Sequence, residues 1–177
     1  MELRSQAVRT LAPENDPLKM GMGWKVEDLA KPQIMVESTY GDSHPGSAHL
    51  NQFTEEAVKA VNENGGKAAR YFATDMCDGI AQGHDGINYS LAHRDAIVNL
   101  VEAQANASVY DGGVFIASCD KSMPAMLMST PPLTLCFSRI AMTSRPRNAR
   151  MAGINAFAFS TSAKNAPAFS APWISTN

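Results

Sequence analysis

The sequence predicts an α/β domain with three layers, α/β/α, built on a mainly parallel sheet over residues 1–130. Three short apolar segments, at residues 33–37, 69–74 and 114–117, have the length and composition of buried strands. The two stretches that separate them carry apolar residues at helical spacing. A β-α-β-α-β order of this kind predicts parallel pairing with right-handed crossovers.

Residues 1–31 come before the first strand and are polar and mixed, with Pro13 and Pro17 as helix breakers. They predict a surface arm or entry segment that contains one short helix, at residues 24–30. Arg4 is the only residue of this arm that we consider for a role in a site.

The clearest helix is predicted over residues 53–64. Thr54 is a suitable N-terminal cap, and Gly65 and Gly66 end the helix. Its apolar residues lie at helical spacing, which predicts packing on the sheet and no direct function (Ala57, Val58 and Val61).

A second helix is predicted after the second strand, with Ser90 as its cap. Its apolar face is formed by Ile97, Val98, Val101 and Ala105. Arg94 and Asp95 are interpreted as a solvated ion pair, and residues 111–113 turn the chain into the third strand.

The loop after the first strand, residues 38–47, is dense in turn formers and is a candidate ligand loop. It contains His44, and His49 follows shortly after it. The two imidazoles could bind a metal, but structural roles are the favoured interpretation because no Cys or acid stands beside them at metal-ligand spacing.

Two Cys-Asp pairs follow the second and third strands. Cys77 and Asp78 form the first pair, and Cys119 and Asp120 form the second, with Lys121 next to it. Ligands of open α/β sheets bind beyond the carboxyl ends of the strands, so both pairs are expected at the same edge of one sheet. Thiolates suit iron–sulfur or another thiophilic metal, and carboxylates suit Mg²⁺. The competing interpretation is that these are turn residues and small buried cysteines.

The glycines between these pairs, Gly79, Gly83 and Gly86, have the spacing G-x-x-x-G-x-x-G. This spacing is neither the dinucleotide-binding fingerprint nor a P-loop. Tight turning of the backbone against a ligand or a neighbouring helix explains them better.

The bulk composition excludes several classes of protein. Hydrophobic residues make up 45% of the 177, which excludes general disorder, and no apolar run approaches the ~20 residues of a membrane span. Three cysteines and no recognisable export signal predict a reducing, cytoplasmic location. Residues 1–130 carry a net charge of −7, whereas residues 131–177 carry +5 and no acid. The second segment is basic, rich in Pro, Ala and Ser, and predicted to be an irregular tail.

The motifs of residues 4–129 resemble the dihydroxy-acid dehydratase / 6-phosphogluconate dehydratase family. The matching pieces are residues 45–50, 77–86, 89–94, 111–112 and 119–128. The resemblance implies a hydro-lyase that converts a 2,3-dihydroxy acid or a sugar acid to a 2-oxo acid, in amino-acid biosynthesis or sugar-acid catabolism. It further implies an iron–sulfur cluster, 4Fe–4S in preference to 2Fe–2S, together with Mg²⁺. The partner is a small-molecule acid, with no nucleic acid or membrane, and the intact enzyme is expected to be a homodimer.

Carried over residue by residue, the resemblance makes Cys77 and Cys119 cluster ligands, as in the phosphogluconate branch. It makes Asp78 and Asp120 ligands of Mg²⁺. Lys121 matches a lysine that is carbamylated in some members and then binds Mg²⁺; the unmodified ammonium has no lone pair for a metal.

Two departures from the family pattern stand out. Many members have a cysteine in the loop that reads residues 44–47 here, and this chain has none. After Met128 the family continues with a further cluster cysteine, a second domain and the catalytic base, so no catalytic residue is assigned here. Residues 131–177 do not match and suggest a truncated or frameshifted gene, and Cys136 within them receives no role. The alternative function is an inactive α/β remnant that binds a metal or a partner through its basic tail.

Overall fold

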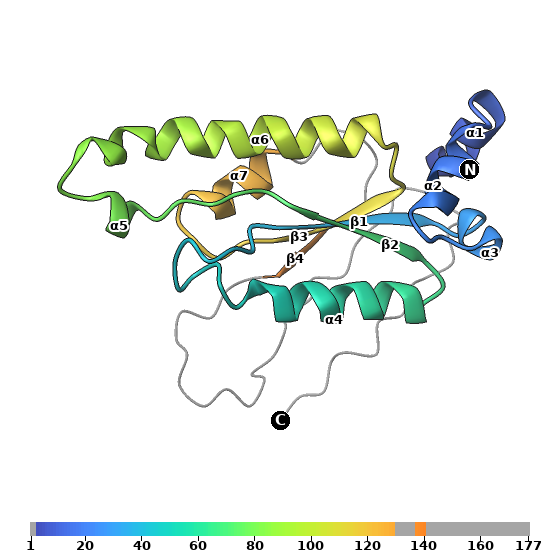
Figure 1. Ribbon diagram of the computed structural model, residues 1–177, viewed down its shortest axis with the longest axis horizontal. Coiled ribbons are helices and arrows are strands. Elements are labelled where there is room, and N and C mark those ends of the chain that lie inside the picture. The colour runs from blue at the N-terminus through green and yellow to red at the C-terminus, as the bar shows by residue number, and fades with distance from the viewer. Residues whose placement is uncertain (1–2, 130–136, 141–177) are drawn as a thin grey trace.

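The computed structural model describes residues 3–129 and 137–140, and it confirms the three-layer α/β/α prediction (Figure 1). Its sheet has four strands in the order β2-β1-β3-β4, and every neighbouring pair is parallel. The strands are β1 (Gln33–Ser38), β2 (Lys67–Phe72), β3 (Gly112–Ile116) and β4 (Phe137–Ile140). Helix α4 (Leu50–Glu63) covers one face, and α6 (Tyr89–Ala107) and α7 (Ser122–Met128) cover the other.

The register of the sheet brings three strand ends level with one another. Ser38, the last residue of β1, lies opposite Phe72 of β2 and Ile116 of β3. The loops that follow these strands therefore leave the sheet side by side at its carboxyl edge.

Alternating side chains of β1 divide the core in two. Met35 faces α6 and packs in a cluster with Ile97 and Val101. Val36 faces α4 and packs with Leu50 and Ile116. The apolar face predicted for α6 is confirmed, since Ile97, Val101 and Ala105 are buried and Val98 packs against them.

The two predicted helix caps are wrong. Helix α4 begins at Leu50, so Thr54 lies inside it, and its buried hydroxyl donates to the Leu50 carbonyl at 3.0 Å. Helix α6 begins at Tyr89, with Ser90 in its first turn. In both cases the preceding loop already forms a turn, and the helix continues from that turn. The predicted end of α4 is confirmed, with Gly65 at a φ of +85° that favours glycine.

The N-terminal segment is more ordered than the predicted surface arm. It forms α1 (Arg4–Leu11), α2 (Asn15–Gly21) and α3 (Val26–Leu29). Ser5 is buried, and its backbone N–H and hydroxyl both donate to the Asp111 carboxylate, at 2.9 and 2.5 Å. Asp111 precedes β3 and also accepts from the Gln33 N–H at 2.8 Å, so this anchor lies at the amino edge of the sheet. Helix α1, which begins at Arg4, is thus at the opposite end of the sheet from the carboxyl-edge loops (Figure 1).

Part of the predicted irregular tail is regular. Residues 137–140 form β4, which pairs with the open edge of β3. An edge strand needs only backbone groups to pair, so a segment without a strand-like pattern can supply one. The other residues of the 131–177 segment, Cys136 among them, lie outside the described residues, and the boundary near residue 130 stays a prediction.

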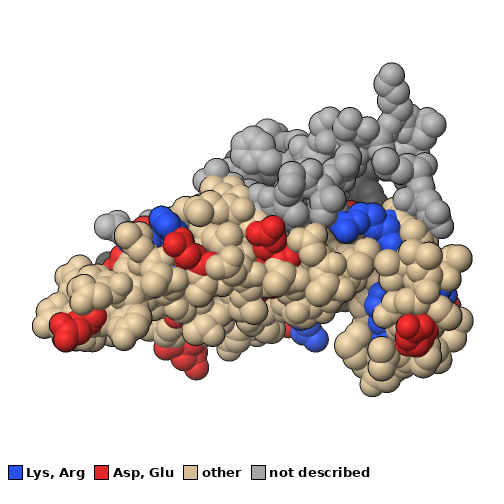
Figure 2. Space-filling view, turned by 90° about the horizontal axis from the view of Figure 1, so that it is seen from above, with Lys and Arg blue, Asp and Glu red and all other residues tan. Residues whose placement is uncertain are grey.

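The surface above α6 shows no concentration of charge. Figure 2 shows acidic and basic side chains scattered over a mostly neutral surface on this side of the described residues. The net negative charge of residues 1–130 is therefore not gathered into one patch on this face. Among the described helices, none is long and apolar enough to cross a membrane.

Candidate metal centre

Three loops meet at the carboxyl edge of the sheet. They follow β1, β2 and β3, and backbone hydrogen bonds continue the sheet into them, from the Ala73 N–H to the Ser38 carbonyl at 3.0 Å and from the Thr39 N–H to the Ile116 carbonyl at 3.1 Å. The loops are thus fixed at their origin. All five predicted site residues lie on the second and third of them or on the short helices that follow.

Asp78, Asp120 and Lys121 are brought together, although 42 residues separate the two carboxylates in the sequence. Asp78 begins α5 (Asp78–Ala81), and its Oδ2 accepts a hydrogen bond from Lys121 Nζ at 2.7 Å. The same Nζ lies 3.4 Å from Asp120 Oδ2. The Lys121 ammonium therefore lies between the two carboxylates that the family resemblance assigns to Mg²⁺.

The charges of this group shift each other's protonation. The hydrogen bond from Lys121 lowers the pKa of Asp78, and the nearby Ser90 hydroxyl lowers it further. The hydrogen bond to Asp78 in turn raises the pKa of Lys121. Asp78 Oδ1 and Ser90 Oγ are buried, and neither has a partner of hydrogen-bond geometry among the described residues. The Asp78 carboxylate therefore has a buried oxygen that Lys121 does not use, with the Ser90 hydroxyl near the carboxylate, and such an oxygen suits a cation.

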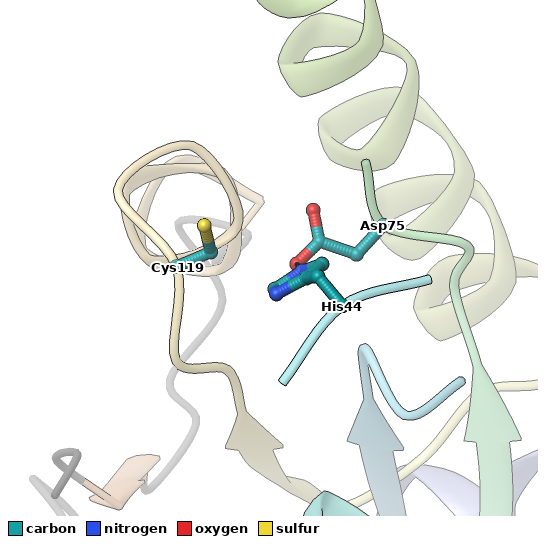
Figure 3. Close-up of side chains that lie close together, drawn as sticks. All are labelled: His44, Asp75 and Cys119. Atoms are coloured by element: carbon teal, nitrogen blue, oxygen red, sulfur yellow. Dashed lines mark hydrogen bonds and ion pairs between the residues drawn. The ribbon is translucent and has the colours of Figure 1, made fainter. Parts of the chain in front are cut away.

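A second group is formed by His44, Asp75 and Cys119 (Figure 3). Their potential ligand atoms all lie within 4.8 Å of one another. His44 Nε2 and Asp75 Oδ2 are 3.1 Å apart, and the two side chains are 3% and 1% exposed. Each residue comes from a different loop, so the group exists only because the three strand ends are level.

Gly46 connects two of these loops. Its N–H donates to His44 Nδ1 at 3.0 Å, and its carbonyl accepts a hydrogen bond from the Ser118 hydroxyl. A Cβ at this position would meet His44 ring atoms at 2.8 Å and Ser118 Oγ at 3.0 Å. The close approach of the loops requires glycine here.

Both predicted cluster cysteines are free and half-buried. Burial, and next the hydrogen bond that the thiol donates to Asp120 Oδ1 at 3.4 Å, raises the pKa of Cys119 to about 11. A thiolate at this position needs a nearby cation to be stable. Cys77 follows β2 at the same sheet edge but does not belong to the three-residue group, so the shared cluster stays a prediction.

Sequence reasoning missed Asp75 and favoured a structural role for His44. Asp75 lies two residues before Cys77, so the sequence alone could have placed it in the same loop after the second strand. The pairing of His44 with Asp75 depends on the path of the loop after β1, for which the turn-forming residues give no unique conformation.

The fold and this edge of the sheet define an α/β domain whose strand-end loops gather thiol, carboxylate and imidazole groups that could hold a metal ion. The pattern of the family described as "Dihydroxy-acid/6-phosphogluconate dehydratase N-terminal" matches residues 31–164. The chain belongs to this family. The match reaches beyond residue 129, where the motifs quoted above end, and the out-of-frame origin suggested for the tail stays untested.

Individual relatives agree with the family. A dihydroxy-acid dehydratase of Methanococcus aeolicus is 40% identical over 135 residues, which cover 76% of this chain and 24% of the relative. A dihydroxy-acid dehydratase of Desulfitobacterium hafniense is 39% identical over 124 residues, 70% of this chain and 22% of the relative. The chain thus spans about a quarter of the length of the curated relatives that it matches.

Proposed function

We propose that this chain carries the metal-binding N-terminal part of a dehydratase that removes water from a 2,3-dihydroxy acid or a sugar acid. The observation that supports this most is the convergence of Asp78 and Asp120 on one cation, the ammonium of Lys121, next to Cys119. Both the order of these residues and the family membership agree with it.

Asp78 and Asp120 would hold Mg²⁺ in this proposal. Two close carboxylates repel each other unless a cation lies between them, and in the described structure the Lys121 ammonium has that position. Mg²⁺ competes for the same oxygens, and a lysine that becomes carbamylated changes from competitor to ligand. Because CO₂ reacts with the neutral amine, the raised pKa of Lys121 opposes this modification while the Asp78 ion pair persists.

Cys77 and Cys119 would hold the iron–sulfur cluster. When bound, cluster iron and Mg²⁺ supply Lewis-acid chemistry, for the leaving hydroxyl and for the carboxylate end of the substrate respectively. The residues of this chain bind and orient these groups. None of the described residues is assigned as the base that removes the substrate proton.

Anaerobic reconstitution with ferrous iron and sulfide tests the proposal. We expect brown protein with visible thiolate-to-iron absorbance, and loss of most bound iron in Cys77→Ser and Cys119→Ser. Cys136→Ser is the matched control, because Cys136 has no assigned role, and it should retain the wild-type iron content. Protein that stays colourless would favour the alternative, a remnant without a cluster.

A further inference from the structure

We propose that Asp75 is a protein ligand of the metal held by Cys119, and that His44 is not a ligand but the positioning residue that orients Asp75. The inference rests on the proposed function only in taking Cys119 as a metal ligand. It assigns roles to two residues that the motifs left without one.

The hydrogen bonds of His44 determine which of its ring nitrogens carries the proton. The Gly46 backbone N–H can only donate, and it points at His44 Nδ1 at 3.0 Å. Nδ1 must therefore be the acceptor, so the hydrogen of the neutral ring is on Nε2. Nε2 in turn donates to Asp75 Oδ2, 3.1 Å away.

This tautomer leaves His44 without a free lone pair for a metal. Nδ1 is occupied by the Gly46 amide, and Nε2 carries the hydrogen that Asp75 accepts. Binding a metal through Nε2 would place a hydrogen on Nδ1, directly against the Gly46 N–H. The Gly46 amide is held in turn, because the carbonyl of the same residue is bonded to Ser118.

Asp75 still has capacity to bind a cation. Its Oδ2 accepts from His44 and its Oδ1 accepts from the Met76 N–H at 2.8 Å, which uses one lone pair of each oxygen. Each oxygen retains a second lone pair, and one oxygen lies within 4.8 Å of Cys119 Sγ. Figure 3 shows the Asp75 carboxylate and the His44 ring next to each other, both on the side that faces Cys119.

A cation is also needed for Cys119 to act as a thiolate ligand here. A thiolate formed beside the almost fully buried Asp75 carboxylate would be unfavourable unless a positive charge lay between them. A neutral His44 supplies none. A hydrogen-bond donor behind a metal-ligating carboxylate is a common supporting arrangement, and its removal costs about 10–100-fold in metal affinity.

Titration of the full chain with Co²⁺ tests both roles, since a thiolate-to-cobalt charge-transfer band reports on Cys119. We expect Asp75→Asn to weaken Co²⁺ binding at least tenfold while the band remains. His44→Leu should also weaken it about tenfold. His44→Gln should restore most of the affinity, because the glutamine amide donates from the position of Nε2 but is not a metal ligand of comparable strength.

The matched controls are His49→Gln, which changes a half-buried histidine that precedes α4 and lies outside the three-residue group, and Cys119→Ser, which should abolish the band. Wild-type affinity in Asp75→Asn would overturn the role of Asp75. Equal losses in His44→Gln and His44→Leu would show that His44 is itself a ligand. If wild-type protein gives no band that depends on Cys119, the thiolate centre of the proposed function fails as well.

Discussion

Gly46 illustrates how a single residue connects the fold to the site. Its N–H sets the tautomer of His44, its carbonyl receives Ser118, and the space beside its Cα is filled by both of these side chains. In this chain, the loop in which many family members have a cysteine is held in place by the hydrogen bonds of the Gly46 backbone to His44 and Ser118.

Replacement of Gly46 by alanine should destabilise the domain by about 1–3 kcal/mol, because the added methyl group meets buried atoms that are held by hydrogen bonds. Gly41→Ala, in the same loop, is the matched control, since a Cβ there meets nothing within 4 Å. It should leave stability unchanged or raise it by up to about 1 kcal/mol. Urea denaturation of the two variants measures both effects, and equal midpoints would contradict the close packing at Gly46.

The positions of single site residues could be predicted from the sequence only where a strand end fixed them. Asp78, Asp120 and Lys121 each follow a recognisable strand, and the structure brings them together as the parallel sheet requires. His44 and Asp75 meet through the conformation of two loops, and turn-forming residues permit many conformations.

Among the helices and strands, α6 shows how the burial of a side chain determines its contribution to stability. Ile97→Ala should cost about 2–5 kcal/mol, because Ile97 is 2% exposed in the core against the sheet. Leu100→Ala, on the same helix at 55% exposure, should change stability by less than about 0.5 kcal/mol. Chemical denaturation distinguishes the two, and similar losses would mean that α6 does not pack by the face described.

Strand β1 carries a buried acid, Glu37, that should make stability depend on pH. Burial raises the pKa of Glu37 from its ordinary 4.5 to about 8. Between these values the folded chain holds a proton that the unfolded chain has released, so this residue lowers stability as pH rises through that window. The steepest loss is about 1.4 kcal/mol per pH unit.

Glu37→Gln removes the titrating group, so its unfolding free energy should fall less than that of the wild type between pH 5 and pH 8. Glu55→Gln is the control, because Glu55 is half exposed and pairs with Arg70 at the surface. Parallel curves for Glu37→Gln and the wild type would show that the carboxyl is already ionised in the folded state.

Elements with a clear apolar period could be predicted, whereas their first residues could not. Strands β1 to β3 and the packed faces of α4 and α6 bury apolar side chains, and the spacing of these side chains is visible in the sequence. The beginnings of α4 and α6 depend on turns in the preceding loops. The short helix predicted at residues 24–30 is confirmed as α3. Helix α1 escaped prediction because hydrogen bonds between Ser5 and Asp111, 106 residues apart, hold it in place of an apolar stripe.

The two edges of the sheet carry different kinds of side-chain contact. At the amino edge, Asp111 anchors Ser5 and Gln33, and Asp28 pairs with Lys31 and Lys67 at 2.7 and 2.8 Å. At the carboxyl edge, the described carboxylates, thiols and imidazole gather where parallel sheets bind ligands. A structural edge opposite a candidate ligand edge is the arrangement expected of a parallel α/β sheet.

The measurement that tests the metal centre most directly is thermal melting of the full chain with and without Mg²⁺, in bicarbonate so that Lys121 can be carbamylated. At a hundredfold excess over the dissociation constant, Mg²⁺ should stabilise the wild type by about 2.7 kcal/mol. Asp78→Asn and Asp120→Asn should lose most of this gain, and Asp85→Asn, an exposed acid that follows α5, should keep it. The same Mg²⁺ shift in all three variants, or none in the wild type, would contradict a magnesium site at Asp78 and Asp120.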